Sequence, residues 1–248
     1  MLWGLAAGMD HLTASADRIE RLADADAVWR EALGALRTCG IEFVIYLTVD
    51  SEGAHPLLWT NVPEIYAETP PESDPFLSHC CDSFAVTRTG PEFLADHVHL
   101  PPEVHAFVRA AAVSGFRSGI GIPTRLAGSS RYGGFNLGTR LNAETFMREV
   151  MTGAEALRTF CLVVHRRIEE LVLNGAVVAE RLLHELTPRE RELIRLVAEG
   201  RSRKECARLC GISPHTAAEY IQSAYRKLDV HSRVEAARLL AGQELTGG

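Results

Sequence analysis

Residues 184–248 carry helix start signals at four closely spaced places, which strongly limits how this part of the chain can fold. At three of them a hydroxyl residue stands three positions before a glutamate, so that each side chain can bond the backbone amide of the other. These capping boxes are Thr187 with Glu190, Ser202 with Glu205, and Ser232 with Glu235. The fourth start is Ser213 before Pro214, a residue favoured in the first helical turn. The pattern predicts four short helices.

The third predicted helix, residues 214–228, has one apolar and one polar face. The apolar positions, spaced to form one stripe along a helix, are Ala217, Ile221, Ala224 and Leu228. The polar face carries His215, Glu219, Gln222 and Arg226, flanked by Thr216, Ser223 and Lys227. Because the second and third helices meet at a tight turn containing Gly211, the segment predicts a helix-turn-helix. The polar face then offers donors and acceptors that can read base edges in a major groove.

The basic charge of the chain is concentrated in the same segment. Residues 181–248 contain 12 Lys and Arg against 9 Asp and Glu, whereas the first 180 residues contain 14 against 23. A net charge of +3 is modest for DNA binding, so we expect a homodimer on an inverted-repeat site, with each copy neutralising phosphates. The expected DNA-contacting residues are Arg201, Ser202, Arg203, Lys204, His215, Thr216, Glu219, Gln222, Arg226 and Lys227.

The order of residues in this segment resembles the LuxR-type DNA-binding domain. The resemblance rests on Thr187-Pro188-Arg189-Glu190, Gly211-Ile212-Ser213-Pro214, Thr216, Tyr225-Arg226-Lys227-Leu228, Val230, Arg233 and Glu235-Ala236. It implies a transcription regulator that binds double-stranded DNA. The alternative is an unrelated four-helix packing module that shares these signals by chance.

The first 165 residues alternate helical and extended patterns. The predicted helices are 10–38, 74–81, one starting at 101–102, and 143–165; the predicted strands are 41–49, 55–60, 118–126 and 132–140. Mixed helices and antiparallel strands in this order predict an α+β chain whose N-terminal domain is an α/β/α sandwich with a central antiparallel sheet. A C-terminal four-helix all-α helix-turn-helix domain follows it. The expected boundaries are residues 1–170 for the sandwich, 171–183 for a linker and 184–248 for the helix-turn-helix domain.

The N-terminal segment is similar to the autoinducer-binding domain of quorum-sensing regulators. The similarity rests on Asp74-Pro75 and on Gly115-Phe116-Arg117-Ser118-Gly119 followed by Ile122-Pro123. It implies an acyl-homoserine-lactone pocket in which Asp74 accepts a hydrogen bond from the amide of a small-molecule signal. The residue itself allows a second interpretation, in which Asp74 is the N-cap of a helix that begins at Pro75.

The chain departs from this family pattern at three aromatic positions. Tyr66 stands where the family has a tryptophan, Pro70 where it has a tyrosine, and Leu94 where it has a second tryptophan. Trp59 could substitute from the neighbouring strand, or it is a core residue. We therefore expect a different or bulkier signal, or none at all, as in an orphan regulator. The expected ligand-binding residues are Asp74, Tyr66, Trp59, Leu94 and Gly119.

Two other functional classes fit the sequence less well. A phosphorylated receiver domain needs a lysine on a late strand, but the only lysines are Lys204 and Lys227, so Asp50 after the first strand is not its phosphoacceptor. An enzyme could be built from a cysteine and a histidine, but no nucleophile motif supports this and we expect no enzyme. The residues considered for it are Cys80, Cys81, His79, His97 and His105.

The cysteines and the apolar runs suggest where the protein works. Six cysteines are scattered along the chain without a CxxC or a Cys/His ligand pattern, which predicts reduced thiols, a cytoplasmic location and no bound metal. No apolar run approaches the length of a membrane span, so we expect no membrane partner. The only expected cofactor-like molecule is the signal itself.

Overall fold

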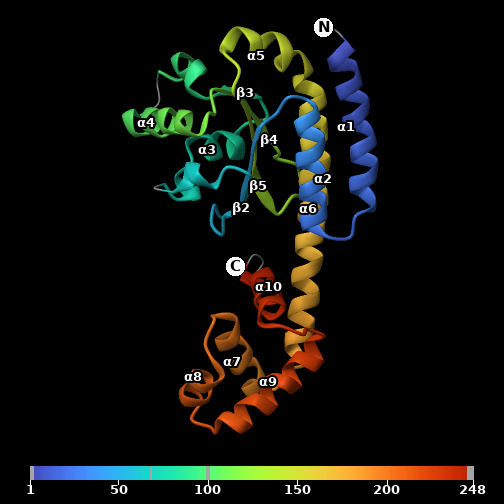
Figure 1. The fold of residues 1–248 in the computed structure, drawn as a ribbon, viewed down its shortest axis with the longest axis vertical. Helices are drawn as coiled ribbons and strands as arrows, with labels where there is room; N and C mark the ends of the chain where they lie inside the picture. Colours follow the sequence, from blue (N-terminus) through green and yellow to red (C-terminus); the bar gives the residue numbers. More distant parts are fainter. Residues whose placement is uncertain (1–2, 68, 99–100, 245–248) are drawn as a thin grey trace. The chain divides into compact units, whose positions relative to one another are not determined.

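The computed structural model describes residues 3–67, 69–98 and 101–244, and its contacts divide the chain into two compact units (Figure 1). The boundary falls between Glu169 and Glu170. Both residues belong to one helix, α6, which runs from Ala154 to His184. The segment 171–183, predicted as a linker, therefore lies within a helix.

The first unit is built on a five-stranded sheet in the described ranges, with the strand order β2-β1-β5-β4-β3 and antiparallel neighbours throughout. The strands are β1 Phe43–Asp50, β2 Leu57–Thr60, β3 Thr87–Thr89, β4 Ser118–Pro123 and β5 Arg131–Thr139. The four predicted strands are confirmed. Strand β3 was not predicted, because three residues of the sequence Thr-Arg-Thr are too few to show an alternating pattern.

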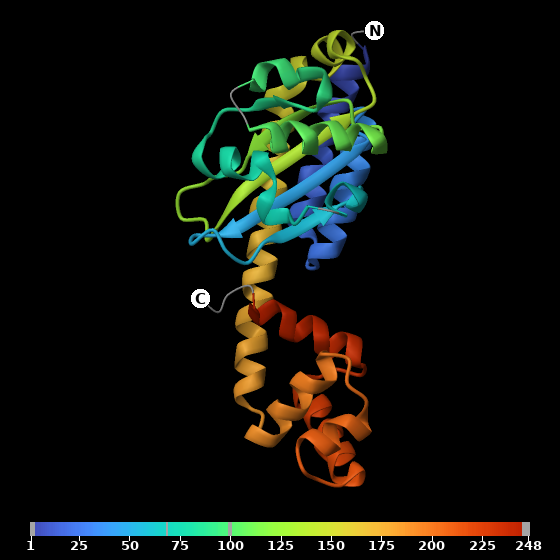
Figure 2. The same cartoon turned by 90° about the vertical axis from the view of Figure 1, so that its left-hand side faces the viewer.

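Helices cover both faces of this sheet (Figures 1 and 2). On one face lie α1 Trp3–Arg21, α2 Ala25–Thr38 and the first part of α6. On the other face lie α3 Pro75–Asp82 and α4 Pro102–Ala111, with the short 3-10 turns η1 Pro63–Tyr66, η2 Pro71–Ser73, η3 Pro91–His97 and η4 Ala112–Ser114 in the connections around them. The arrangement confirms the predicted α/β/α sandwich with a central antiparallel sheet.

Two predicted helices are each broken into two. The helical pattern of residues 10–38 is interrupted before α2, where Asp24 accepts a 2.8 Å hydrogen bond from the amide of Ala27 and so starts a new helix. The helix predicted at 143–165 is α5 Ala143–Glu149, then the turn η5 Met151–Gly153, then α6. Thr152 and Gly153 are poor helix formers, and the chain tightens there into a 3-10 turn.

The sheet face toward α6 carries a buried polar network. The hydroxyl of Tyr46 lies 2.9 Å from Nδ1 of His165, and both side chains are fully buried. Four residues further along α6, Oε1 of Glu169 accepts hydrogen bonds from the hydroxyl and the amide of the Ser129–Ser130 turn, both at 2.7 Å. Burial lowers the pKa of the His165 imidazole, which keeps it neutral. These bonds attach α6 to the sheet and to the β4–β5 turn.

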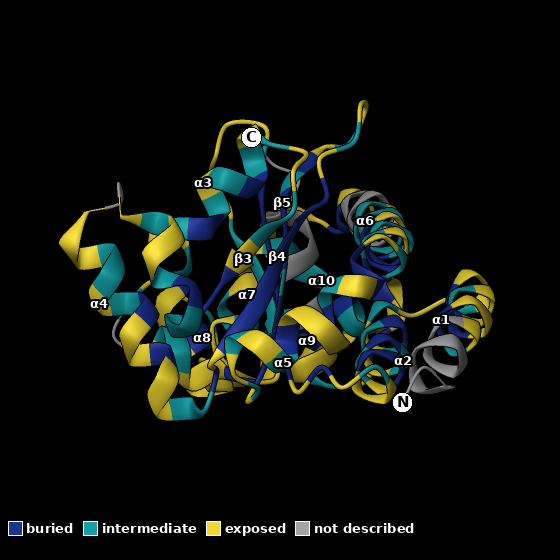
Figure 3. Ribbon diagram, turned by 90° about the horizontal axis from the view of Figure 1, so that it is seen from above, coloured by how far each residue is buried: buried dark blue, intermediate teal, exposed yellow. Residues whose placement is uncertain are grey.

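The opposite sheet face carries an apolar cluster. Its buried members are Phe43, Ile45, Leu47, Val62, Ala111 and Phe116, and the partly buried Leu58, Ile65, Tyr66 and Leu77 pack against them. Strand β4 is buried along its whole length (Figure 3). The cluster lies between the sheet and the α3 side of the unit.

The second unit consists, within its described residues, of the end of α6 and four further helices. These are α7 Pro188–Ala198, α8 Arg203–Leu209, α9 Pro214–Leu228 and α10 Arg233–Glu244. The four predicted helices are confirmed, including the capping boxes at Thr187 and Ser202. No helix in the described part of the chain has an apolar stretch long enough to cross a bilayer.

Candidate functional site

Helices α8 and α9 meet at a tight turn whose geometry is set by two residues. Gly211 has a φ of +65°, a left-handed conformation that glycine adopts without strain. Ser213 then caps α9, because its hydroxyl oxygen accepts a 3.0 Å hydrogen bond from the amide of Thr216. The Thr216 hydroxyl lies 2.9 Å from that of Ser213, so the Thr216 side chain belongs to the cap. These contacts form the turn of a helix-turn-helix.

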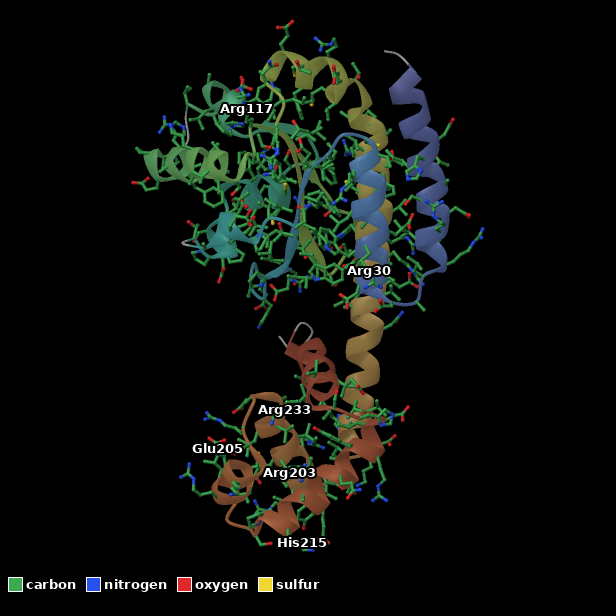
Figure 4. All side chains as sticks on the ribbon, viewed as in Figure 1. Arg30, Arg117, Arg203, Glu205, His215 and Arg233 are labelled. Atoms are coloured by element: carbon green, nitrogen blue, oxygen red, sulfur yellow. The ribbon has the colours of Figure 1, made fainter. Side chains whose placement is uncertain are left out.

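Helix α9 buries one face and exposes the other. Its buried residues are Ala217, Ile221, Ala224 and Leu228, the predicted inward stripe. Four of the predicted base-reading residues are exposed, namely His215, Glu219, Gln222 and Arg226. His215, in the first turn of α9, lies 3.6 Å from the Glu219 carboxylate across one helical turn (Figure 4). The structure thus brings these four residues together on the side of α9 that faces away from the core of the unit.

Exposed cations surround the start of α8. Arg201, Arg203 and Lys204 are all exposed in this short stretch. Ser202 among them is the N-cap of α8, and its hydroxyl donates to a Glu205 carboxylate oxygen at 2.7 Å. The helix N-terminus adds its own positive end to these cations. The arrangement suits contact with a phosphate backbone, with Ser202 in a capping role.

Lys227 differs from the other predicted DNA contacts because it has an internal partner. Its ammonium group lies 2.7 Å from Oε2 of Glu190, a residue of α7 that is only 3% exposed. Burial acts to raise the pKa of Glu190, but hydrogen bonds from Lys227, Ser223 and Thr187 outweigh it and hold that pKa at about 2. Lys227 therefore neutralises a buried carboxylate within its own unit.

In the first unit, Asp74 and Tyr66 lie together at the apolar cluster. The Tyr66 hydroxyl donates a 2.5 Å hydrogen bond to Oδ2 of Asp74, and the amide of Phe76 donates to Oδ1 at 2.8 Å. Asp74 is the N-cap of α3, so one of its two expected roles is present in the structure. Burial raises the pKa of the Asp74 carboxyl, while the Tyr66 hydroxyl and the α3 amides act to lower it.

Gly119 lies on the same sheet face, beneath the ring of Phe116. A Cβ atom at Gly119 would stand 2.5 Å from the Thr89 hydroxyl and 2.7 Å from the Phe116 ring, so only glycine fits there. Leu94 is partly buried in η3. The space above Gly119 is thus taken by protein side chains.

Trp59 does not join this group. It pairs with Tyr46 across β1 and β2, and directly paired residues point to the same side of a sheet. Tyr46 faces His165 of α6, and the Trp59 ring makes an edge contact with Trp29 of α2, with the ring centres 5.7 Å apart. Trp59 therefore packs under α2, on the face opposite to Asp74.

The residues considered for an enzyme are engaged elsewhere. Nε2 of His79, His97 and His105 lies 2.7–3.0 Å from the backbone carbonyl oxygens of Ala85, Arg88 and His97, respectively. Burial raises the pKa values of both the Cys80 and the Cys81 thiols. Among the described residues, no group of three or more His, Cys, Asp or Glu side chains is placed to hold a metal ion.

Two residues important to these sites were not singled out from the sequence. Glu190 was recognised as the partner of Thr187 in a capping box, but its bonds to α9 join residues more than thirty positions apart. Phe116 was noted only as part of the glycine-containing segment before β4. In the structure its ring fills the space over Gly119. A capping motif signals its local bonds only, so neither contact had a signal of its own.

Comparison with known proteins finds a family similar to part of the second unit. Residues 184–240 match the family described as bacterial regulatory proteins, luxR family. The nitrate/nitrite response regulator protein NarP of Escherichia coli K12 is 32% identical over 100 residues, which are 40% of this chain and 46% of NarP. The nitrate/nitrite response regulator protein NarL of the same organism is 40% identical over 58 residues, which are 23% of this chain and 27% of NarL. The matched segments thus span less than half of the length of these relatives.

Solved structures resemble the chain over a greater length. The crystal structure of Escherichia coli SdiA covers 92% of this chain and 94% of its own, at 18% sequence identity and a TM-score of 0.47. The N-acylhomoserine lactone dependent LuxR family transcription factor CepR2 from Burkholderia cenocepacia covers 65% of this chain and 93% of its own, at 19% identity and a TM-score of 0.47. Residues 184–240 of this chain are therefore similar to the luxR family of bacterial regulatory proteins.

Proposed function

We propose that this protein is a transcription regulator whose helix α9 enters the major groove of DNA. The observation that carries the proposal is the exposed polar face of α9, opposite a buried stripe that packs the helix on its own unit. The side chains on that face supply donors and acceptors for base edges. The cations at the start of α8 supply contacts to the phosphates beside the groove.

The proposed assembly on DNA is a homodimer on an inverted repeat. One copy of residues 181–248 carries a net charge of only +3, so a single copy neutralises few phosphates. Two copies related by a two-fold axis double the phosphate contacts and match the symmetry of such a site.

For the first unit we propose a sensor of a small molecule bound between the sheet and α3. Apolar side chains and one buried carboxylate meet there, which suits a ligand with an apolar tail and an amide N–H group. An acyl-homoserine lactone has this chemistry, and the sequence resemblance points to the same class. The free state of all six cysteines, which lie in the described ranges, supports a reducing cytoplasmic location.

A second candidate, a regulator that needs no ligand, is favoured by one specific contact. The Tyr66 hydroxyl already satisfies the Asp74 carboxylate, so this buried group does not depend on a ligand for a partner. In either case we propose a binding protein and not an enzyme.

The proposed function is tested by DNA selection with the full chain. Duplexes selected from a randomised library by the wild-type protein are titrated with the variants His215→Ala, Gln222→Ala and Lys204→Ala. Replacing a base-reading residue should cost about 1–3 kcal/mol of binding free energy at one position of each half-site. Lys204→Ala should instead weaken binding to all sequences alike and flatten the salt slope by about one for each bound copy. Arg30→Ala removes the same charge from an exposed position of the first unit and serves as the control (Figure 4). Unchanged binding in all three variants would remove α9 and α8 from the interface.

A further inference from the structure

The carboxylate of Glu190 accepts hydrogen bonds from three residues in two helical segments of the second unit. Its Oε2 accepts a hydrogen bond from the backbone amide of Thr187 at 2.8 Å and from the ammonium group of Lys227 at 2.7 Å. Its Oε1 accepts a 2.7 Å hydrogen bond from the Ser223 hydroxyl. Thr187 caps α7, whereas Ser223 and Lys227 belong to α9. One carboxylate therefore joins the start of α7 to the second half of α9.

This carboxylate depends on its partners because it is almost fully enclosed. Glu190 is 3% exposed, and a buried ion that loses a hydrogen-bonded partner of opposite charge is strongly destabilised. If Lys227 turned away to a DNA phosphate, Glu190 would lose the one cationic partner that the described residues give it. Competition of this kind favours retention of the internal ion pair when DNA binds.

The partners of Glu190 alternate along α9 with residues proposed to read bases. Gln222 precedes Ser223, and Arg226 precedes Lys227. Neighbouring side chains on a helix point about 100° apart, so the bonds of Ser223 and Lys227 determine where Gln222 and Arg226 point. A rotation of α9 about its axis that broke the bonds to Glu190 would carry both polar residues around with it.

We propose that Glu190 and Lys227 are positioning residues, which fix the rotation of α9 against α7, and that Lys227 does not contact DNA. This inference rests on the proposed reading of DNA by α9. It assigns Lys227 a role different from the phosphate contact that its charge and position suggest in the sequence. It also separates Lys227 from Lys204, the only other lysine of the chain, which is exposed at the start of α8.

The two lysines provide a matched test with the full-length chain. Affinity is measured against salt concentration for a duplex selected by the wild-type protein and for an unrelated duplex of equal length. The variants are Lys204→Met, Lys227→Met, Lys227→Arg and Glu190→Gln, which keeps a hydrogen-bonding group in the capping box. Thermal unfolding of each variant is measured first, so that binding is compared at a temperature at which every variant is folded.

The two lysine variants should behave differently. Lys204→Met should flatten the salt slope by about one for each bound copy on both duplexes and leave their affinity ratio unchanged. Lys227→Met should keep the wild-type slope and lower the ratio of selected to unrelated affinity about ten-fold, because misplaced side chains lose base contacts. Glu190→Gln should lower the same ratio, and Lys227→Arg, which keeps the charge, should retain most of it.

Each other outcome overturns the inference. A slope flattened by about one for each bound copy in Lys227→Met would make Lys227 a phosphate contact. A wild-type slope and a wild-type ratio in Lys227→Met would show that the ion pair does not position α9. If Glu190→Gln does not fold, the two Lys227 variants decide alone. Failure of the proposed function is recognised separately, because Lys204→Met and Gln222→Ala would then bind both duplexes as the wild type does.

Discussion

Tyr66 donates its hydroxyl to Oδ2 of Asp74 at 2.5 Å, while the amide of Phe76 occupies Oδ1. Each oxygen of this buried carboxylate thus has a partner from the protein itself. A carboxylate oxygen can accept a second hydrogen bond, so a ligand amide can join Tyr66 at Asp74 without displacing it. The tyrosine hydroxyl is therefore part of the surface that any ligand of Asp74 would meet.

Tyr66→Phe should destabilise the first unit. The substitution removes the hydroxyl and leaves Oδ2 of a buried carboxylate without that donor, a loss of about 1–3 kcal/mol in the free energy of unfolding. Urea unfolding of the full chain measures it. Tyr132→Phe, which removes a hydroxyl from another half-buried ring, is the control and should change stability less. Equal effects of the two variants would contradict a special role for the bond to Asp74.

Asp74→Asn should change how stability depends on pH. Burial raises the pKa of Asp74 above its ordinary value of 3.8, so the folded state binds the proton more tightly than the unfolded state does. Above the folded-state pKa, the buried ionised carboxylate destabilises the wild-type protein by its whole amount. This destabilisation decreases as pH falls toward the ordinary pKa, because the carboxyl becomes protonated. The stability of Asp74→Asn relative to the wild type should therefore decrease as pH falls from 7 toward about 4. A relative stability that rises over this interval would contradict the raised pKa.

An ordinary acyl-homoserine lactone should bind weakly. The three aromatic positions of the family pattern carry Tyr66, Pro70 and Leu94 here, which removes two or three contacts to the ligand, and Trp59 lies on the other face of the sheet. At about 1 kcal/mol for each lost contact, affinity should fall by roughly ten- to a hundred-fold. Calorimetric titration with a panel of acyl chain lengths measures this. Nanomolar binding that Asp74→Ala abolishes would show that other residues of the chain compensate.

The protein should footprint on DNA as a dimer. We expect two protected half-sites related by an inverted repeat, with centres about one helical turn apart, since each copy presents one α9. Sedimentation of the protein with the selected duplex should give two chains for each duplex. A single asymmetric half-site occupied by one chain would rule out this assembly.

The local signals of the sequence predicted most of the fold. The helix starts at Thr187, Ser202 and Ser213 were predicted from capping residues. The capping hydrogen bonds join residues only three positions apart, so they form wherever the helix forms. The four longer strands were read in the same way from their runs of apolar and β-branched residues. Interruptions were harder to predict, because the break at Met151–Gly153 lies inside a sequence that is helical on both sides.

Contacts between distant residues were not predictable in this way. The position of Trp59 on the α2 face follows from its pairing with Tyr46, and a shift of one residue in that register would have turned it toward Asp74. The pairing of Lys227 with Glu190 joins residues 37 positions apart, so charge alone suggested a phosphate contact. Sequence patterns therefore indicated which side chains belong to the two candidate sites. They did not indicate which of these side chains already have a partner within the protein.

Methylation protection on the selected duplex shows directly whether α9 enters the major groove. Guanine N7 lies in the major groove and adenine N3 in the minor groove, so one reagent that methylates both reports which groove is covered. We expect the wild-type protein to protect guanine N7 within each half-site, and Gln222→Ala or His215→Ala to lose protection at individual positions. Protection of adenine N3 alone, with every guanine N7 still reactive, would contradict it.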